Sequence, residues 1–232
     1  MDVMKVAVMY SGGKDSNQAL AWCLENNHKV VALISVKPKN AESFLYQYAT
    51  VEWTRFSAEA LDIPLIHIKS EKIGPKEEAD ELEEVFRELE VDAIIVGGVG
   101  LQKTQIREWK RVAGKFGIEL MVPYENLTSE ELIDKEVKSG LKIIITNVAS
   151  DGLGPEWLGK EINNESLEEL KLLSKKYGFD IDFEGGYADT FVCDAPFFKK
   201  KIEFKRTERI WDNKTNSGYL QVNDAILLDK EE

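Results

Sequence analysis

The sequence predicts an α/β protein, with a parallel sheet covered by helices on both faces and a smaller C-terminal α+β domain. Three observations support this prediction. Short apolar runs rich in β-branched residues alternate with segments of helical period up to about residue 150. These runs are apolar throughout, which is typical of strands buried on both faces. Beyond that point one helical segment is followed by three strand-like runs.

The strands of the first part are predicted from the apolar runs. Each run has a suitable length for a strand and is too short for an ordinary amphipathic helix. The first run begins near the N-terminus, so we expect the chain to start with a strand and not with a signal peptide. The predicted strands span residues 6–10, 30–36, 64–68, 93–99, 119–122 and 142–148.

Helices are predicted between these strands. In residues 76–90 apolar side chains recur at steps of three and four, with acidic residues on the opposite face. Thr128 followed by Glu131 is a capping box, which marks the start of a helix. The predicted helices span residues 18–25, 76–90 and 102–116, with a further one from Thr128 to Gly140.

The second part has its own order of elements. A helix over residues 165–177 is expected to stop at Gly178. Residues 212–217 are rich in turn formers and predict a hairpin between the last two strands. The predicted strands are 190–198, 202–210 and 218–228, and we expect two domains, 1–124 and 125–232, with the boundary near Tyr124 to Thr128.

A glycine-rich loop follows the first predicted strand. It contains Ser11, Gly12, Gly13, Lys14, Asp15 and Ser16 and leads into the first helix. Backbone N–H groups and a helix N-terminus converge on a phosphate in this context, and the glycines allow close approach. Lys14 offers a positive charge, and Asp15 is placed to hold a Mg²⁺ ion. The loop fits neither G-x-x-x-x-G-K-[ST] nor G-x-G-x-x-G.

Ligands of an open α/β sheet bind beyond the carboxyl ends of its strands. Ser35 lies at the end of the second predicted strand, and Gly97 and Gly98 lie at the end of the fourth. We therefore expect these residues to line the nucleotide site together with the glycine-rich loop. A plain loop is an equally good interpretation of the two glycines.

Composition excludes several classes of function. A formal net charge of −12 argues against an extensive nucleic-acid surface. No apolar run approaches the ~20 residues that span a bilayer, so a cytoplasmic protein is expected. Cys23 and Cys193 are expected to be free buried thiols, and His28 and His67 are isolated, which disfavours a zinc site or a histidine-dependent triad.

A second glycine segment precedes the first of the late strands. It reads Glu184-Gly185-Gly186-Tyr187-Ala188-Asp189-Thr190 and leads to the DAPFF sequence of residues 194–198. Alone, it could be a simple turn or bulge. Together the two motifs resemble the diphthine–ammonia ligase family, which carries SGGKDS near the N-terminus and an E-G-G-E-Y-E-T-like segment in its second domain.

The resemblance covers nearly the whole chain. SGGKDS is the loop of the ATP pyrophosphatase (PP-loop) superfamily, and the second segment points to the particular family. The resemblance implies an N-type ATP pyrophosphatase with a HUP/Rossmann-like nucleotide-binding domain, similar to the adenine nucleotide alpha hydrolases. Further similar segments are residues 42–47, 58–65, 105–107, 140–149 and 151–153.

The second segment departs from the pattern of the family. Phe183 stands where the first glycine of G-E-G-G-E-Y-E-T is usual, and Tyr187-Ala188 replaces Glu-Tyr. Asp189 replaces the last glutamate. These changes leave the ATP loop intact and bear on the acceptor substrate.

The resemblance implies an AMP-forming carbon–nitrogen ligase that uses ATP and Mg²⁺. Diphthine on translation elongation factor two, ammonium and ATP would give diphthamide, AMP and pyrophosphate through an acyl-adenylate. Lys14, Asp15, Glu184 and Asp189 are the implied catalytic residues. The implied acceptor-binding residues are Tyr46, Tyr48, Gln105, Gly185, Gly186, Tyr187 and Thr190.

Other functions stay open on the residues alone. A tRNA-modifying pyrophosphatase would share the loop, but sulfur relay usually needs paired cysteines and RNA binding needs a basic surface. A nucleotide sensor similar to the universal stress proteins would hold ATP or make ADP, whereas a pyrophosphatase makes AMP. The sequence leaves the oligomeric state open, a homodimer included.

Overall fold

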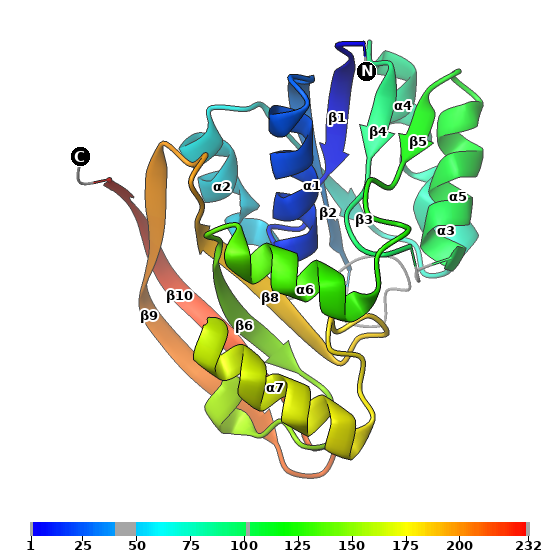
Figure 1. The fold of residues 1–232 in the computed structure, drawn as a ribbon. Coiled ribbons are helices and arrows are strands. Elements are labelled where there is room, and N and C mark those ends of the chain that lie inside the picture. The colour runs from blue at the N-terminus through cyan, green and yellow to red at the C-terminus, as the bar shows by residue number, and fades with distance from the viewer. Residues whose placement is uncertain (1, 40–49, 101–102, 231–232) are drawn as a thin grey trace.

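The computed structural model describes residues 2–39, 50–100 and 103–230, and it contains two sheets (Figure 1). The first sheet has five strands in the order β3-β2-β1-β4-β5, and every neighbouring pair is parallel. This confirms the predicted parallel α/β sheet. Its strands are β1 (Lys5–Met9), β2 (Lys29–Pro38), β3 (Leu65–Ser70), β4 (Ala93–Ile95) and β5 (Glu119–Met121).

Helices cover both faces of this sheet because its strands are apolar on both sides. In β1, Val6 and Val8 pack in the core that includes α1 residues, while Ala7 and Met9 pack with α5 residues such as Trp109. Alternate side chains of a strand point to opposite faces, which accounts for this division. The helices are α1 (Lys14–Glu25), α2 (Thr54–Leu61), α3 (Pro75–Asp80), α4 (Glu83–Glu88) and α5 (Lys103–Gly114), with a turn of 3-10 helix, η1, at Val51–Trp53.

One predicted helix is wrong. Residues 76–90 form two short helices, α3 and α4, instead of one. Glu81 at the junction binds the end of β3, where its carboxylate accepts hydrogen bonds from Ser70 Oγ and from the Glu71 N–H at 3.1 Å. The break at the junction keeps Leu82 and Phe86 fully buried, so the apolar period survives without a continuous helix.

The second sheet is antiparallel and has the order β7-β6-β10-β9, with β8 paired to β6. Residues 142–148, which we grouped with the alternating strands of the first part, form a strand of this second sheet. Two capped helices accompany it, and the capping box of Thr128 and Glu131 is confirmed. The elements are α6 (Ser129–Lys138), β6 (Lys142–Val148), η2 (Pro155–Trp157), β7 (Glu161–Ile162), α7 (Asn164–Tyr177), β8 (Ala188–Asp194), β9 (Lys200–Asp212) and β10 (Ser217–Asp229).

The two sheets share one hydrophobic core. A single cluster of buried side chains joins the α1 and α2 face of the first sheet to β6, β8 and the β9–β10 hairpin. Backbone hydrogen bonds cross the same boundary, from the Val192 N–H to Gly12 O at 2.8 Å and from the Lys199 N–H to Ala60 O at 2.7 Å. Strand β8 is thereby fixed against the loop that follows β1.

Two expectations from composition can be compared with the structure. Cys23 and Cys193 are both free and buried, as predicted. Among the described residues, no helix has the length and apolar character needed to cross a membrane.

Candidate functional site

The site lies at the topological switch point of the first sheet, where the order in which the chain adds strands reverses. From β1 the chain moves to β2 and β3 on one side and then returns to β4 on the other, so the carboxyl ends of β1 and β4 are neighbours. The loops after these strands touch. A Cβ atom on Gly97 would lie only 2.3 Å from the backbone oxygen of Asp15. Glycine at position 97 therefore allows the start of α1 to approach the end of β4.

The glycine-rich loop is held by β8 of the second part. Gly12 has φ +83° and packs so closely on Phe191 that a Cβ there would lie 2.6 Å from its ring. Gly13 is the N-cap of α1, and the Lys14 N–H donates to Thr190 Oγ1 at 3.2 Å. A residue that we expected to bind the acceptor thus supports the first turn of α1.

Polar side chains hold the loop from within. Ser11 Oγ accepts a hydrogen bond from the Gly13 N–H at 3.3 Å, and Ser16 Oγ donates to Gly13 O at 3.0 Å. Asn17 Nδ2 donates to the carbonyl oxygens of Gly12 and Gly13 at 3.1 and 2.9 Å. The loop that precedes α1 is therefore pre-organised by its own residues.

Lys14 is buried among three carboxylates. Its side chain is 1% exposed, and Nζ lies 2.9 Å from Asp15 Oδ1, 3.3 Å from Glu136 Oε2 and in direct contact with Asp182 Oδ1. Asp15 comes from α1, Glu136 from α6, and Asp182 from the segment between α7 and β8. We call Asp15, Glu136 and Asp182 the carboxylate cluster. Three distant parts of the chain meet at this ammonium group.

The protonation of the cluster follows from burial and mutual repulsion. Burial raises the pKa of Asp182 to about 8, and it raises the pKa of Glu136 well above its usual value, although Lys14 acts in the opposite direction on both. Burial alone would lower the pKa of Lys14, but the charges of Asp15, Asp182 and Glu136 raise it well above its usual value. Lys14 therefore stays charged.

The second glycine segment forms a tight turn beside the loop after β4. Gly185 and Gly186 have φ of +101° and +85°, and the Gly186 N–H donates to Phe183 O at 3.2 Å. Glu184 is buried, and its Oε1 would lie 2.7 Å from a Cβ on Gly98. Two predicted site residues from different halves of the chain are thus brought together.

Phe183 has a left-handed backbone with φ +65°. Only glycine adopts this region without strain, which explains why a glycine at this position suits the pattern described above. Here Phe183 is 5% exposed, and the centroid of its ring lies 6.3 Å from the centroid of the Phe179 ring. Burial of the ring offsets the backbone strain.

Asp189 lies on β8 opposite β6. Its Oδ2 accepts a hydrogen bond from Asn147 Nδ2 at 3.2 Å, and burial raises the pKa of Asp189 to about 6 despite this bond. Since Thr190 follows it directly, Asp189 is one residue away from the support of the glycine-rich loop. Asp189 is therefore an acidic residue whose pKa lies near the neutral range.

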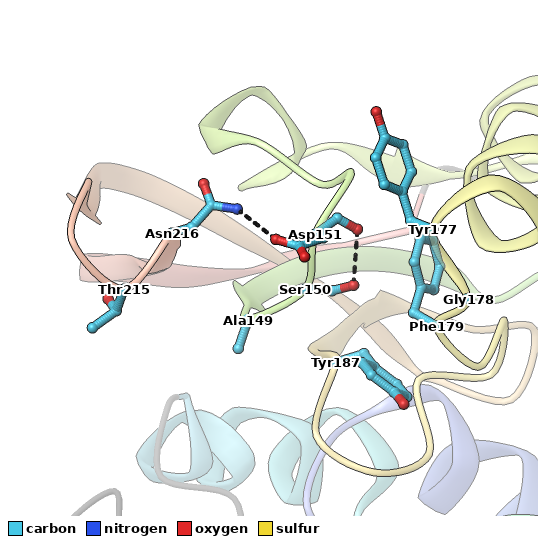
Figure 2. Close-up of a pocket in the computed structure, with 9 residues that line it drawn as sticks. All are labelled: Ala149, Ser150, Asp151, Tyr177, Gly178, Phe179, Tyr187, Thr215 and Asn216. Carbon is cyan, nitrogen blue, oxygen red and sulfur yellow. Dashed lines mark hydrogen bonds between the residues drawn. The ribbon is translucent and has the colours of Figure 1, made fainter.

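Tyr187 lines a pocket of about 370 Å³ on the second part of the molecule. Figure 2 shows the rings of Tyr177, Phe179 and Tyr187 on one side of Ser150. Thr215 and Asn216, from the turn between β9 and β10, lie on the other side, and Asn216 Nδ2 donates to Asp151 Oδ1 at 3.4 Å. The pocket therefore combines aromatic faces with a carboxylate.

The remaining predicted residues are less informative. Ser35 is fully buried and its hydroxyl donates to Tyr10 O, so it joins β2 to β1 at the end of the sheet. Gln105 is half-buried on α5, and its role in acceptor binding stays a prediction. Tyr46 and Tyr48, with the similar segment 42–47, lie outside the described residues.

Sequence reasoning missed Glu136 and Asp182. Glu136 carries a signal that could have found it, because it lies three and four residues after the buried Ile133 and Leu132, on the apolar face of α6. A glutamate at such a position needs a buried partner. Asp182 has a weaker signal, since it precedes the second glycine segment by two residues.

Comparison with known proteins identifies the family. The profile of the diphthamide synthase N-terminal domain matches residues 4–120, and that of the diphthamide synthase C-terminal domain matches residues 128–228. The diphthine–ammonia ligase of Bos taurus is 33% identical over 98% of this chain and 94% of its own length. The chain belongs to the diphthine–ammonia ligase family. The Homo sapiens enzyme is 30% identical with the same coverage, and the Schizosaccharomyces pombe enzyme is 32% identical over 99% of this chain and 40% of its own length.

The similarity to this family includes both parts of the site. The residues matched by the N-terminal profile include the glycine-rich loop and Gly97, and those matched by the C-terminal profile include Glu136, Asp182 and the second glycine segment. The family resemblance stated from the two motifs is therefore confirmed. The domain boundary near Tyr124 to Thr128 stays a prediction.

Proposed function

We propose that this chain is a ligase that amidates diphthine on translation elongation factor two with ammonium and ATP. The contact of the second glycine segment with the glycine-rich loop is the structural observation that carries the proposal. Asp182 and Thr190 bind Lys14, and Glu184 lies against Gly98. An acceptor held by the second segment would be next to ATP held by the loop. A cytoplasmic location and a homodimer stay predictions.

The chemistry begins with activation of a carboxylate. Its oxygen attacks the α-phosphorus of ATP, the bond from that phosphorus to the bridging oxygen of pyrophosphate breaks, and pyrophosphate leaves. The acyl-adenylate is then attacked by ammonia, which forms the amide, releases AMP and loses a proton. Positioning and stabilisation of charge on pyrophosphate are the main tasks of the protein. The N–H groups at the start of α1 and the charge of Lys14 suit these tasks.

The carboxylate cluster suits Mg²⁺, because hard carboxylate oxygens are the ligands that this ion prefers. When bound, Mg²⁺ would supply positive charge that neutralises phosphate oxygens. Asp15 is its first candidate ligand, since it belongs to the glycine-rich loop and its side chain is 32% exposed. Lys14 has a separate task, which is to hold the leaving pyrophosphate.

The acceptor carries a trimethylammonium group, and quaternary cations favour aromatic faces and nearby acids. Tyr187, Glu184 and Asp189 are the residues of this chain that we assign to it, and the pocket beside Tyr187 adds Tyr177 and Asp151. The double variant Tyr187→Ala, Glu184→Gln should raise the KM for the acceptor and leave the KM for ATP unchanged. An unchanged acceptor KM would remove these residues from the acceptor site.

The reaction itself is tested with diphthine-bearing elongation factor two, ATP–Mg²⁺ and ¹⁵N-labelled ammonium. Mass spectrometry should find ¹⁵N in the amide of the modified residue. Lys14→Ala should abolish the product, whereas Lys138→Ala, an exposed lysine of α6, should not. Absence of label with folded protein and intact diphthine would contradict the proposal. It would then favour another acceptor, such as a tRNA base, which the full-length similarity to diphthine–ammonia ligases disfavours.

A further inference from the structure

The three carboxylates around Lys14 carry more negative charge, when ionised, than its ammonium group can balance. Three carboxylates and one ammonium group sum to −2 when all are ionised, and the side chains of Glu136 and Asp182 are fully buried. Buried charge is costly unless it is compensated. If all three carboxylates are ionised, as ligands of a cation are, Lys14 leaves an excess of two negative charges, which equals the charge of one divalent cation.

Several oxygens of the cluster also have no donor. Within the part of the chain that the structure describes, Asp182 Oδ2 and both carboxylate oxygens of Glu136 are buried without a hydrogen-bond partner, and Glu136 Oε2 has only the ion pair with Lys14. A buried acceptor without a partner loses the hydration that it had in the unfolded chain. These oxygens converge on the same place as Asp15, which points to a cation as their shared partner.

The size of the cluster suits one ion. One ligand atom from each carboxylate lies within 4.8 Å of the other two. Oxygen ligands lie about 2.1 Å from Mg²⁺, so ligands on opposite sides of the ion are about 4.2 Å apart. A small adjustment of side chains brings the cluster into that range. No histidine or cysteine belongs to this group of ligands, which favours Mg²⁺ or Mn²⁺ over softer metals.

We propose that Glu136 and Asp182 join Asp15 in one divalent-cation site, and that the cation competes with Lys14 for these carboxylates. Binding of the cation weakens the ion pairs that keep Lys14 buried and makes its ammonium group available to a phosphate. The second half of this inference rests on the proposed function, in which Lys14 holds pyrophosphate. The first half does not, because it concerns a metal site that forms without nucleotide.

The site would also connect the two parts of the chain. Asp15 lies at the start of α1, whereas Glu136 and Asp182 belong to the second part. One ion bound by all three would fix the second glycine segment relative to the glycine-rich loop. Metal binding should therefore stabilise the whole fold, in addition to making the ammonium group of Lys14 available to a phosphate.

The test uses the full chain without nucleotide and Mn²⁺ as the probe, with free Mn²⁺ measured by electron paramagnetic resonance. We expect one Mn²⁺ per chain, displaced by Mg²⁺. Glu136→Gln and Asp182→Asn should each raise the Kd about ten-fold or more, because each replaces a charged ligand by an amide. Asp134→Asn is the matched control, since Asp134 lies on the same helix but pairs with Lys171 outside the cluster.

Lys14→Met gives the sharpest result. If lysine and metal compete, this variant should bind Mn²⁺ about ten-fold more tightly than the wild type, because a positive charge next to the ion is removed. No Mn²⁺ binding by the wild type at millimolar concentration, or weaker binding by Lys14→Met, would overturn the inference. Failure of the proposed function would instead appear as absent ¹⁵N incorporation with normal Mn²⁺ binding.

Discussion

Lys14 and Asp182 stabilise each other as a buried ion pair. Loss of either partner leaves the other buried without a counter-charge. Lys14→Met should lower the free energy of unfolding by about 3 kcal/mol, because it leaves buried carboxylates without a counter-charge. The double variant Lys14→Met, Asp182→Asn should recover part of that loss, since an amide needs no counter-charge. Urea unfolding in the presence of a chelator measures both values, and simple additivity of the two single effects would contradict the pairing.

Asp189 makes a pH-dependent contribution of its own. Its pKa is raised from 3.8 to about 6 by burial, so the folded state holds the proton more tightly than the unfolded state does. The associated stability is present below pH 3.8 and is lost as the pH rises through 6. The Asp189→Asn variant does not lose this stability. Its free energy of unfolding, relative to that of the wild type, should therefore rise by about 1 kcal/mol between pH 4 and pH 7. This value is reduced because Asp189 is partly exposed.

Urea unfolding at the two pH values measures this difference directly. The hydrogen bond from Asn147 favours the ionised carboxylate, so it opposes the effect of burial and makes the expected difference smaller. A difference that stays constant or falls with pH would contradict a raised pKa of Asp189.

At the scale of elements, the approach of α1 to β4 depends on a residue without a side chain. Gly97→Ala places a methyl group 2.3 Å from the Asp15 backbone oxygen and 2.4 Å from its carbonyl carbon. Because neither atom belongs to a flexible side chain, we expect a loss of about 2 kcal/mol in the free energy of unfolding. The displaced start of α1 should also weaken ATP binding.

Gly114→Ala is the matched control for this prediction. Gly114 lies in α5, and a Cβ there meets nothing within 4 Å. Alanine should stabilise the helix by about 0.5–1 kcal/mol and leave ATP binding unchanged. Thermal unfolding and equilibrium nucleotide binding distinguish the two variants, and equal effects of both would contradict the role given to Gly97.

The helices and strands also show which sequence signals are sufficient to predict an element. The apolar runs predicted every strand of the first sheet, and Thr128 with Glu131 predicted the start of α6, because both signals are local. The single helix predicted over residues 76–90 was wrong: two short helices form there, and Glu81 between them binds the end of β3. That interaction joins two elements, and the helical period does not contain it.

At the scale of the whole molecule, the site exists because two sheets share one core. The sequence indicated its two glycine segments, and the structure brings them together through Phe191, Thr190 and Glu184. It could not indicate that Glu136 and Asp182 meet Asp15, since more than a hundred residues and the boundary between the two sheets separate Asp15 from each of them. Only the packing of α6 and of the segment before β8 on α1 places these acids on Lys14.

The central claim is that the glycine-rich loop holds the triphosphate so that the α-phosphorus is attacked. Product analysis with α- and γ-labelled ATP, diphthine-bearing elongation factor two and ammonium tests it most directly. The account predicts one AMP and one pyrophosphate for each amide formed, both dependent on the acceptor. ADP and orthophosphate as the acceptor-dependent products would contradict it.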